Sequence, residues 1–485
     1  MKLYNILEES EILGYKGNLD IEIEGIAYDS RNVRQNYLFV CISGSANDGH
    51  NYIDEAISKG AVAIIVEKDV AREGVTIVRV EQSRKILPII ASKYYNHPTD
   101  SLKLIGITGT NGKTTTTYLV KSILESWNKK VGLIGTISIE IGNREIESTR
   151  TTPESLDLQQ IFREMLDCGA DYGVMEVSSH SLEFGRVDGC KFHMGVFTNL
   201  TQDHLDFHKT IENYRKAKEK LFYMTKHVNI INIDDKEGRT IGDNIKSSGI
   251  PLLTYGINQK ADIMAKDIKI SDAGVVFKLI TPDFETKIKS SIPGRFSVYN
   301  CLAAASIAYA EGIDDVTISK GIEKILYVPG RSEVIDIDKP YKIIIDYAHT
   351  PDGLENILNS IKYYVKGRII SVFGCGGDRD KTKRPKMGEI AGRLSDYCII
   401  TSDNPRTEDP YSIIQEIEEG IKDTNCSYIC IENRKEAIKY AMELAKAGDI
   451  ILLAGKGHET YQVRKDKTID FDERVIVKEL LEEGV

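Results

Sequence analysis

The residues of this chain with the clearest chemical potential stand in a glycine-rich run over residues 104–117. A β-branched apolar segment over residues 102–107 predicts a buried strand, and a helical pattern begins at Lys113. At such a junction the helix N-terminus binds phosphate, a lysine reaches the outer phosphates, and a hydroxyl such as that of Thr114 holds a magnesium ion. The glycine spacing departs by one residue from the commonest motif, so we predict a variant phosphate loop. An ordinary glycine-rich turn is the alternative.

A carboxylate ends another predicted strand, over residues 172–176. Glu176 is followed closely by Ser178 and His180, which is not the pattern of a buried core. A carboxylate at the carboxyl end of a strand can ligate magnesium near the loop phosphates. The alternative is a solvated edge carboxylate. Arg186 follows as a candidate anion contact.

Two of the nine histidines, His204 and His208, follow a predicted strand in a loop that is rich in acids. This density predicts a metal or acid–base site, and the spacing by itself also suits zinc. No cysteine lies near them in the sequence, so magnesium is favoured and zinc keeps a low weight.

The elements that must position these residues alternate between strand and helix. Residues 1–98 predict a small α/β domain. Its polar stretches 29–31 and 43–50 are candidates for binding a nucleotide-linked substrate, with capped turns as an equal alternative.

Further on, Thr151 or Thr152 is the expected N-cap of a helix. The lysine-bearing helix over residues 214–222 is typical of a solvated face. A turn over residues 292–300 is expected to lead into an alanine-rich helix over residues 301–310.

The last third of the chain predicts a doubly wound α/β domain. Its expected strands are residues 343–346, 369–373, 397–401, 427–431 and 449–453. Polar or glycine-rich loops follow four of them, at residues 346–351, 374–381, 402–406 and 454–459. Open α/β sheets bind ligands at the carboxyl ends of their strands, so these loops are expected to converge on one crevice.

Composition limits the function classes. The 485 residues carry 63 basic and 73 acidic side chains, a net charge of −10, with no strong basic patch, which argues against nucleic-acid binding. The eight cysteines form no CxxC pair and are expected to be reduced thiols. No apolar run approaches about 20 residues, and the start of the chain is too charged for a signal peptide. We expect a cytoplasmic protein without membrane insertion.

Several of these motifs together resemble the Mur ligase family. They are residues 108–115, 176–180, 199–204, 346–351 and 374–380. The resemblance covers nearly the whole chain, in order, and implies three domains. Residues 1–99 would bind the UDP-linked substrate, residues 100–330 would form a phosphate-loop ATPase domain with a mostly parallel sheet, and residues 331–485 would form a Rossmann-like domain for the amino acid.

The resemblance implies an ATP-dependent ligase of peptidoglycan synthesis, and so a part in cell-wall biogenesis, cell shape and division. Its substrates would be UDP-N-acetylmuramoyl-L-alanyl-D-glutamate and meso-2,6-diaminopimelate, and its cofactors ATP and Mg²⁺. A carboxylate would attack the γ-phosphate to give an acyl phosphate, which the amine then displaces. The protein is expected to be a monomer.

The family's site residues carry over one by one. Lys113 and the loop around it would bind ATP, together with residues in three later segments: Gly109, Thr110, Asn111, Gly112, Thr114, Thr115, Asn300, Arg331, Asp346 and His349. Lys218 matches the family's carbamylated lysine and, with Glu176 and His204, would hold a second magnesium ion, while Thr114 holds the first. A carbamate offers the oxygen donors that a hard cation prefers.

Substrate contacts carry over in the same way. Ser30 would bind the UDP end, and the muramoyl-dipeptide part would meet Thr151, Thr152, Ser178 and Arg186. Phe184 stands where some members have a glutamine that contacts this substrate. The amino-acid pocket would comprise Arg379, Asp403, Asn404, Pro405, Arg406, Gly455 and Glu459. Diaminopimelate has a distal carboxylate that lysine lacks, and the Arg406 guanidinium can pair with it in bidentate fashion.

Four alternatives stay open. Within the ligases these are a lysine-adding enzyme and, with less support, a folylpolyglutamate-type synthase. An ATP-driven switch would need only the phosphate loop and leaves the C-terminal loops unexplained. A nucleotide-sugar binding module does not account for the paired metal ligands.

Overall fold

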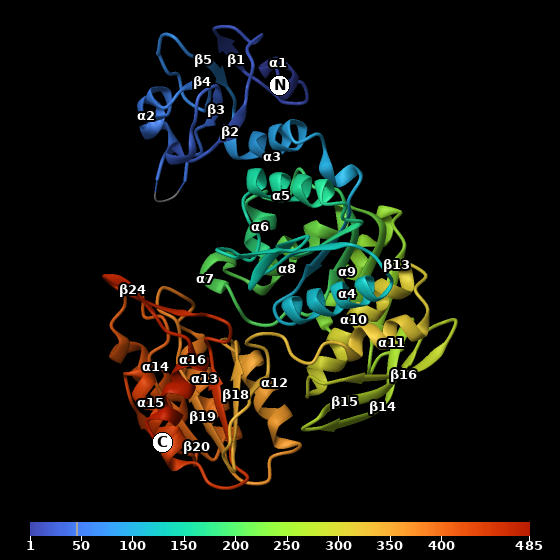
Figure 1. Ribbon diagram of the computed structural model, residues 1–485, viewed down its shortest axis with the longest axis vertical. Coiled ribbons are helices and arrows are strands. Elements are labelled where there is room, and N and C mark those ends of the chain that lie inside the picture. Colours follow the sequence, from blue (N-terminus) through green and yellow to red (C-terminus); the bar gives the residue numbers. More distant parts are fainter. Residues whose placement is uncertain (45–46) are drawn as a thin grey trace. The chain divides into compact units, whose positions relative to one another are not determined.

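A computed structural model describes residues 1–44 and 47–485 (Figure 1). Residues 45 and 46, in the predicted substrate loop, lie outside the described residues. The chain divides into two compact units. The first comprises Met1–Gly106, Lys129–Gly195 and Ala217–His227, and the second Ile107–Asn128, Val196–Lys216 and Val228–Val485. The elements that continue from one unit into the other are β6 (Lys103–Thr108), β11 (Phe192–Phe197), α8 (Ile211–Glu219) and β12 (Thr225–Asn232).

The first unit begins with a five-stranded sheet of order β1-β5-β4-β3-β2. Its strands are β1 (Gly14–Lys16), β2 (Gly25–Ala27), β3 (Tyr37–Val40), β4 (Ala61–Val66) and β5 (Thr76–Arg79). Its helices are α1 (Leu3–Leu7), α2 (Ile53–Ser58) and α3 (Ser83–Tyr94), with short 3-10 turns at η1 (Ser30–Asn32), η2 (Gly49–Tyr52) and η3 (Pro98–Asp100). Successive side chains of a strand point to opposite faces, so Leu38 packs with α1 and α3 while Phe39 packs with α2.

The rest of the first unit contains β7 (Val131–Ile134), β8 (Ser138–Ile141), β9 (Arg144–Glu147), α5 (Ser155–Asp167), β10 (Tyr172–Glu176), α6 (Ser179–Glu183) and η4 (Lys220–Tyr223). β10 pairs in parallel with β7, and β7, β8 and β9 pair antiparallel. The prediction that Thr151 or Thr152 caps α5 is wrong. The helix begins at Ser155 after an extended Glu154 without a side-chain cap, because the Thr152 hydroxyl donates instead to the Glu176 carbonyl at 2.9 Å.

In the second unit the phosphate-loop helix α4 (Lys113–Ser126) packs against α10 (Arg295–Ala310) and α11 (Asp315–Glu323). Its other elements before the C-terminal sheet are α7 (Leu205–His208), α9 (Lys236–Ile245), η5 (Lys246–Ser248), β13 (Leu252–Gly256), β14 (Ile263–Ser271), β15 (Gly274–Ile280) and β16 (Glu285–Ser290). The helix expected at residue 301 begins six residues earlier, at Arg295. The predicted turn is therefore shorter, and Asn300 is helical.

The C-terminal part of the second unit is a six-stranded sheet of order β17-β18-β22-β19-β20-β21. Its strands are β17 (Glu333–Ile335), β18 (Lys342–Asp346), β19 (Ile369–Phe373), β20 (Tyr397–Ile400), β21 (Ser427–Cys430) and β22 (Ile450–Ala454). A hairpin of β23 (Tyr461–Arg464) and β24 (Lys467–Asp470) follows. The five predicted strands agree with β18 to β22 within one residue at each end.

Helices cover both faces of this sheet. α12 (Pro351–Lys362), α13 (Lys383–Leu394) and α14 (Pro410–Ile421) share one apolar core with it, and α15 (Arg434–Leu444) and α16 (Glu473–Glu482) share the other. β18, β22, β19, β20 and β21 are parallel. The predicted α/β class and the doubly wound C-terminal domain are confirmed. Among the residues that the structure describes, none of the helices has the length and apolar composition of a membrane span.

Candidate functional site

The phosphate loop closes on itself around two glycines. Gly109 has φ +152°, and a Cβ there would lie 1.9 Å from Thr198 Oγ1. Gly112 has φ +85°, and a Cβ there would lie 2.4 Å from Asn300 Oδ1. The chain therefore needs glycine at both positions for conformation and for close approach. Gly112 is the N-cap of α4, so the N-terminal turn of the helix, with the partial positive charge of its dipole, begins at this loop.

Lys113 folds back over this loop. Its Nζ donates to the carbonyls of Gly109 at 3.0 Å and of Thr110 at 2.8 Å. The Thr110 hydroxyl lies 3.2 Å from the Tyr214 hydroxyl and accepts from Thr201 N at 3.0 Å. The lysine ammonium is thus held at the loop itself, where an outer phosphate of a bound nucleotide would attract it.

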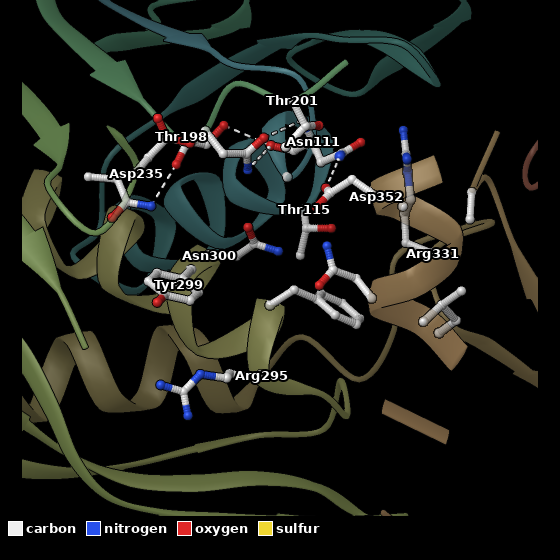
Figure 2. A pocket seen from close by; sticks show the side chains of 18 of the residues that line it. Asn111, Thr115, Thr198, Thr201, Asp235, Arg295, Tyr299, Asn300, Arg331 and Asp352 are labelled. Atoms are coloured by element: carbon white, nitrogen blue, oxygen red, sulfur yellow. Dashed lines mark hydrogen bonds between the residues drawn. The ribbon is translucent and has the colours of Figure 1, made fainter. Parts of the chain in front are cut away.

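A cavity of about 340 Å³ opens beside the loop (Figure 2). Of the ATP-binding residues predicted from the sequence, six line this cavity: Asn111, Gly112, Thr115, Asn300, Arg331 and Asp346. Figure 2 shows Asn111 and Thr115, from the phosphate loop and the first turn of α4, and Asn300, from α10, arranged around this one space. Asn111 is tied across it, because its side-chain amide donates to Asp352 Oδ2 at 2.7 Å. The cavity gathers loop, helix and C-terminal residues of the second unit around one volume.

Sequence reasoning missed the residues that line the side of this cavity opposite the phosphate loop. Asn232, Asp234 and Asp235 at the carboxyl end of β12 line it with Asn258, Arg295 and Tyr299. The Asp234 carboxylate accepts from three backbone N–H groups, of Ile257, Asn258 and Gln259, and from the Tyr299 hydroxyl at 2.8 Å. The available signal was a polar run directly after an apolar strand, the same pattern that singled out Glu176.

Arg331 connects the cavity to the phosphate loop. Its Nη2 donates to the Thr114 hydroxyl at 2.9 Å, and its guanidinium lies 4.7 Å from the centre of the Tyr347 ring. Burial raises the pKa of Asp346, against the opposing effect of Arg331 and of the Ser332 and Ala348 N–H groups that bond to it. The fold therefore brings together three of the predicted ATP-binding residues, Thr114, Arg331 and Asp346.

His349 does not line this cavity. Its Nδ1 lies 2.7 Å from the Tyr347 carbonyl oxygen, and its Nε2 lies 3.8 Å from Asp203. Burial lowers the pKa of His349 to about 4, with Lys383 adding to the effect. Asp203, which the sequence analysis did not single out, also lies 3.3 Å from His204 and 3.8 Å from Lys383.

Asp203 stays ionised although it is buried. Burial opposes the charge, but His204, Lys383 and His349 outweigh it and hold the pKa of this carboxyl below its ordinary value. The carboxylate thereby holds two imidazoles in place. His204 has φ +54°, which the backbone N–H bond to the Asp203 side chain at 2.9 Å supports.

In the first unit Glu176 is a buried acceptor and not a solvated edge carboxylate, with 1% of its surface exposed. Its two oxygens accept from Thr136 N at 2.8 Å and Thr136 Oγ1 at 3.0 Å. The Thr136 hydroxyl lies 3.1 Å from that of Thr151. Thr152 accepts from Ser178 N at 3.1 Å. Four of the predicted site residues therefore form one hydrogen-bonded group.

Three arginines surround one carboxylate in the first unit. Glu154 lies 2.8 Å from Arg150, 2.9 Å from Arg186 and 3.7 Å from Arg84. Burial lowers the pKa of Arg186, against the attraction of Glu154. Only Arg186 was predicted, because the other members are separated in sequence and form a cluster only in the fold. The positive surplus suits an anionic substrate.

A cavity of about 620 Å³ lies beside this cluster, lined by Ser30, Arg84, Arg150 and Glu154 among others. The Ser30 hydroxyl donates to Glu55 at 2.8 Å. Phe184, the departure from the family pattern, lies with its ring centre 5.5 Å from the Arg84 guanidinium and 5.8 Å from that of Arg186. The aromatic ring thus supports the two arginines by cation–π contact.

The lysine-bearing helix α8 is only partly a solvated face. The Lys216 side chain is 60% exposed, whereas Lys218 is 1% exposed. Burying an ammonium is costly unless it is compensated, so this position is set apart from the other lysines of the run.

In the C-terminal crevice the loops after β20 and β22 interlock. The Asn404 amide donates to Glu459 at 2.8 Å, and Lys456 Nζ, which is fully buried, donates to Glu459 at 2.9 Å. Gly455 has φ +114°, and a Cβ there would lie 2.6 Å from Asp403. Burial opposes the charge of Asp403, but Lys456 and Arg434 hold its pKa below the ordinary value.

Arg406 is fixed at the same crevice. Its backbone N–H donates to the Val463 carbonyl at 3.1 Å, and its Nη1 donates to the Gly377 carbonyl at 2.8 Å. Its backbone lies in the left-handed region, at φ +52°. Burial, and the nearby Arg379, lower the pKa of Arg406. The Pro405 carbonyl packs against Gly377. The predicted convergence of these loops is therefore observed within the second unit.

Arg384 is a further residue that sequence reasoning missed. It is fully buried and donates to Glu408 at 2.9 Å and to Glu416 at 2.8 Å. Glu408 also accepts from the backbone N–H of Asp378 at 2.6 Å. This ion pair therefore joins the loop that carries Arg379 to the loop that carries Arg406.

We expect Glu408→Gln to lower the free energy of unfolding by about 1.5–3 kcal/mol at pH 7, the contribution of a hydrogen bond to a charged group. The Arg384 hydrogen bond lowers the pKa of Glu408 from its ordinary 4.5 to about 2. The folded state thus favours the ionised form, and this stability is present above pH 4.5 and lost as the pH falls toward 2. Urea unfolding at pH 7, 4.5 and 3 measures it.

The control for this variant is Glu389→Gln, at an exposed carboxylate 3.3 Å from Arg393 on the same helix as Arg384. Its effect should stay within about 0.5 kcal/mol at every pH. A Glu408→Gln deficit that does not shrink on acidification would contradict the ion-pair explanation.

Three family profiles match successive stretches of the chain. The Mur ligase family catalytic domain matches residues 22–95, the Mur ligase middle domain matches residues 107–308, and the Mur ligase glutamate ligase domain matches residues 330–457.

Among curated relatives, the UDP-N-acetylmuramoyl-L-alanyl-D-glutamate--2,6-diaminopimelate ligase of Caldanaerobacter subterraneus subsp. tengcongensis is 54% identical and covers 97% of both chains. The enzyme of the same name from Clostridioides difficile is 50% identical over 99% of both. A solved structure of such a ligase has a TM-score of 0.70 at 32% identity, covering 100% of this chain and 99% of its own. Mycobacterium tuberculosis folylpolyglutamate synthase, at 16% identity, a TM-score of 0.64 and 76% and 92% coverage, shares the fold alone.

Proposed function

The chain belongs to the Mur ligase family, and we propose that it catalyses the ATP-dependent addition of meso-2,6-diaminopimelate to UDP-N-acetylmuramoyl-L-alanyl-D-glutamate. The observation that carries this proposal is the agreement, over 97% or more of the chain, with relatives that bear this activity in their names at 50–54% identity. The reaction would supply a peptidoglycan precursor.

ATP is the nucleotide that we assign to the cavity beside the phosphate loop. The polar wall formed by Asn232, Asp235 and Asn258 offers donors and acceptors for a base, and the N-terminus of α4 suits the phosphates. Lys113 would move from the Gly109 and Thr110 carbonyls to the γ-phosphate and neutralise charge on the transferring group. Arg331, held against Thr114, would add a second cation.

Magnesium fits the oxygen donors that the resemblance names. Glu176 is a buried carboxylate oriented by both donors of Thr136, and Thr114 offers a hydroxyl. Lys218 is buried, which suits conversion of its ammonium to a carbamate. When bound, the ion would neutralise phosphate charge. The resemblance gives Thr114 to the first ion and Glu176, His204 and the Lys218 carbamate to the second, and both assignments stay predictions.

The UDP-linked substrate is assigned to the first unit. The cavity beside Ser30 and the arginine cluster around Glu154 offer hydroxyl and guanidinium groups to its anionic parts. Thr152 and Ser178 are fixed by mutual hydrogen bonds and would bind the peptide arm. The terminal carboxylate of that arm would be phosphorylated, and the amine would then displace phosphate.

The amino acid is assigned to the C-terminal crevice. Arg406 and Arg379 would bind the distal carboxylate of diaminopimelate, and Glu459 and Asp403 its ammonium groups. The network of Lys456, Asn404 and Glu459 keeps the acceptor side of this pocket in place.

The test is phosphate release by the purified protein with ATP and a panel of amines. A diaminopimelate ligase releases phosphate only when both the UDP-linked dipeptide and meso-diaminopimelate are present. Turnover with ATP alone would favour the ATP-driven switch. Equal turnover with L-lysine would favour the lysine-adding enzyme. Turnover only with a folate and glutamate would favour the folylpolyglutamate-type synthase. Binding of the UDP-linked dipeptide without any turnover would favour the nucleotide-sugar module.

We expect Arg186→Ala to raise the KM for the UDP-linked dipeptide about 10-fold or more, because one charge-assisted contact is lost. The KM for ATP should be unchanged, and phosphate-release kinetics at varied substrate measure both. Arg163→Ala is the matched control, since Arg163 pairs locally with Asp167 on α5. A parallel rise in both KM values would contradict the assignment.

Three expectations remain proposals. The domain bounds 1–99, 100–330 and 331–485 are supported by the three successive profile matches. The monomeric state and the cytoplasmic location stay predictions.

A further inference from the structure

Two cysteines meet at the edge of the C-terminal sheet, outside the crevice assigned to the amino acid. The sulfur of Cys426 lies 3.7 Å from the sulfur of Cys398, so the two thiols are in contact. Cys398 is the second residue of β20, and Cys426 directly precedes β21.

The strand register explains why the side chains meet. β20 and β21 are parallel, with Cys398 opposite Tyr428 and Tyr397 opposite Ser427. Cys426 is two positions before Tyr428, so its side chain points to the same face as that of Tyr428. Both cysteines accordingly pack in the apolar core that the sheet shares with α12, α13 and α14.

The two thiols differ in their access to solvent. Cys398 is fully buried, whereas Cys426 is partly exposed and lines a surface cavity of about 990 Å³ between α13 and α14. Cys426 also lies 3.3 Å from the Ser427 carbonyl oxygen and 3.5 Å from that of Ser395. The hydrogen bond with Cys398 holds the pKa of Cys426 below its ordinary value, while the same bond and burial raise that of Cys398. The partly exposed Cys426 is therefore placed to meet an oxidant from solvent, and the buried Cys398 is placed to attack its sulfur afterwards.

We propose that Cys398 and Cys426 form an oxidisable dithiol, a modification site at which a peroxide converts the two thiols into a reversible disulfide. Cys426 ionises, its thiolate attacks one peroxide oxygen and the O–O bond breaks, so that Cys426 becomes a sulfenic acid. The leaving hydroxide takes up the proton that Cys426 released, which gives the first water. The Cys398 sulfur then attacks the Cys426 sulfur, and the hydroxyl leaves as a second water with the Cys398 proton. Two thiols lose two electrons and two protons, and one peroxide is reduced to two waters.

The movement required is small. The sulfur atoms must close from 3.7 Å to the bond length of about 2.05 Å. The bond would join β21, the edge strand of the sheet, to β20, whose carboxyl end leads into the loop of Asp403 and Arg406.

The experiment treats the reduced full-length protein with hydrogen peroxide, alkylates the remaining thiols and maps tryptic peptides. The two thiols fall in separate peptides, residues 394–406 and 423–434. We expect a cross-linked pair with a mass about 2 Da below the sum of the two, from the loss of two hydrogens, and its disappearance after dithiothreitol. Peptide 423–434 contains both Cys426 and Cys430, so fragmentation of the cross-linked pair is needed to show which of the two carries the bond.

Variants separate this pair from accessible thiols in general. Cys430→Ser and Cys168→Ser, at two exposed cysteines, should form the cross-link as the unaltered protein does. Cys426→Ser should lose it, and Cys398→Ala should leave a sulfenic acid on Cys426 that dimedone captures. Two results would overturn the proposal. In the unaltered protein, peroxide could oxidise Cys168 and Cys430 and leave peptide 394–406 unlinked, or it could link Cys398 to Cys430 instead of Cys426.

Discussion

Replacing Lys113 with Met should lower kcat about 10³-fold or more, with the fold retained. The methionine side chain matches lysine in length but has no charge for the transferring phosphoryl group. Removing one pre-positioned electrostatic group from such a site costs about 10²–10⁵ in rate, and a 10³-fold loss corresponds to about 4 kcal/mol of transition-state stabilisation. Phosphate release under saturating ATP, UDP-linked dipeptide and diaminopimelate measures it.

The second role of Lys113 must be separated from the first. Its Nζ also bonds the Gly109 and Thr110 carbonyls, so the variant can loosen the loop as well as lose the charge. Lys113→Arg keeps a cation but not the compact ammonium geometry, and should recover only a small part of the rate. Lys320→Met, at an exposed lysine of α11, is the control. If Lys113→Met kept more than about a tenth of the rate, the proposed role in phosphoryl transfer would fail.

The parts of the site that the sequence predicted are those encoded locally. A strand, glycines and a helix start within 14 residues are enough to indicate the phosphate loop, and Gly109 and Gly112 are indeed required there by close contacts with Thr198 and Asn300. The C-terminal strands were predicted within one residue because each is a short apolar run between polar loops.

The residues that sequence reasoning missed depend on distant partners. The polar run after β12 marks Asp234 in the sequence, but its partners, the loop after β13 and Tyr299, reach its carboxylate only in the fold. Arg384 is separated from Glu408 by 24 positions, and no periodicity relates them. Ion pairs of this kind have no local pattern, so their prediction requires the tertiary fold.

The wrong local predictions have a similar cause. Thr152 has the right residue type for an N-cap, but the buried carbonyl of Glu176 takes its hydroxyl as donor. The turn before the alanine-rich helix was predicted too long because Phe296 and Tyr299 interrupt the alanine pattern. α10 is buried on most sides, and its packing against α4 and the sheet decides where it begins.

Arg406→Ala should reduce kcat/KM for meso-diaminopimelate by about 30-fold to several thousand-fold, equivalent to about 2–5 kcal/mol for a buried charge pair. Its guanidinium is held by the Gly377 carbonyl, so it is oriented before the amino acid binds and loses little entropy on pairing with the distal carboxylate. Arg406→Lys should recover little, because a point charge cannot make the bidentate contact.

L-Lysine distinguishes selection by Arg406 from general damage to the pocket. Lysine has no distal carboxylate, so its kcat/KM, measured in the same phosphate-release assay, should stay unchanged or rise in Arg406→Ala. Arg393→Ala, at an arginine near Glu389 on the surface of α13, should alter neither substrate. Equal losses for both amines would mean that Arg406 only supports the loops through Gly377 and Val463, and diaminopimelate preference would then have to reside in Arg379.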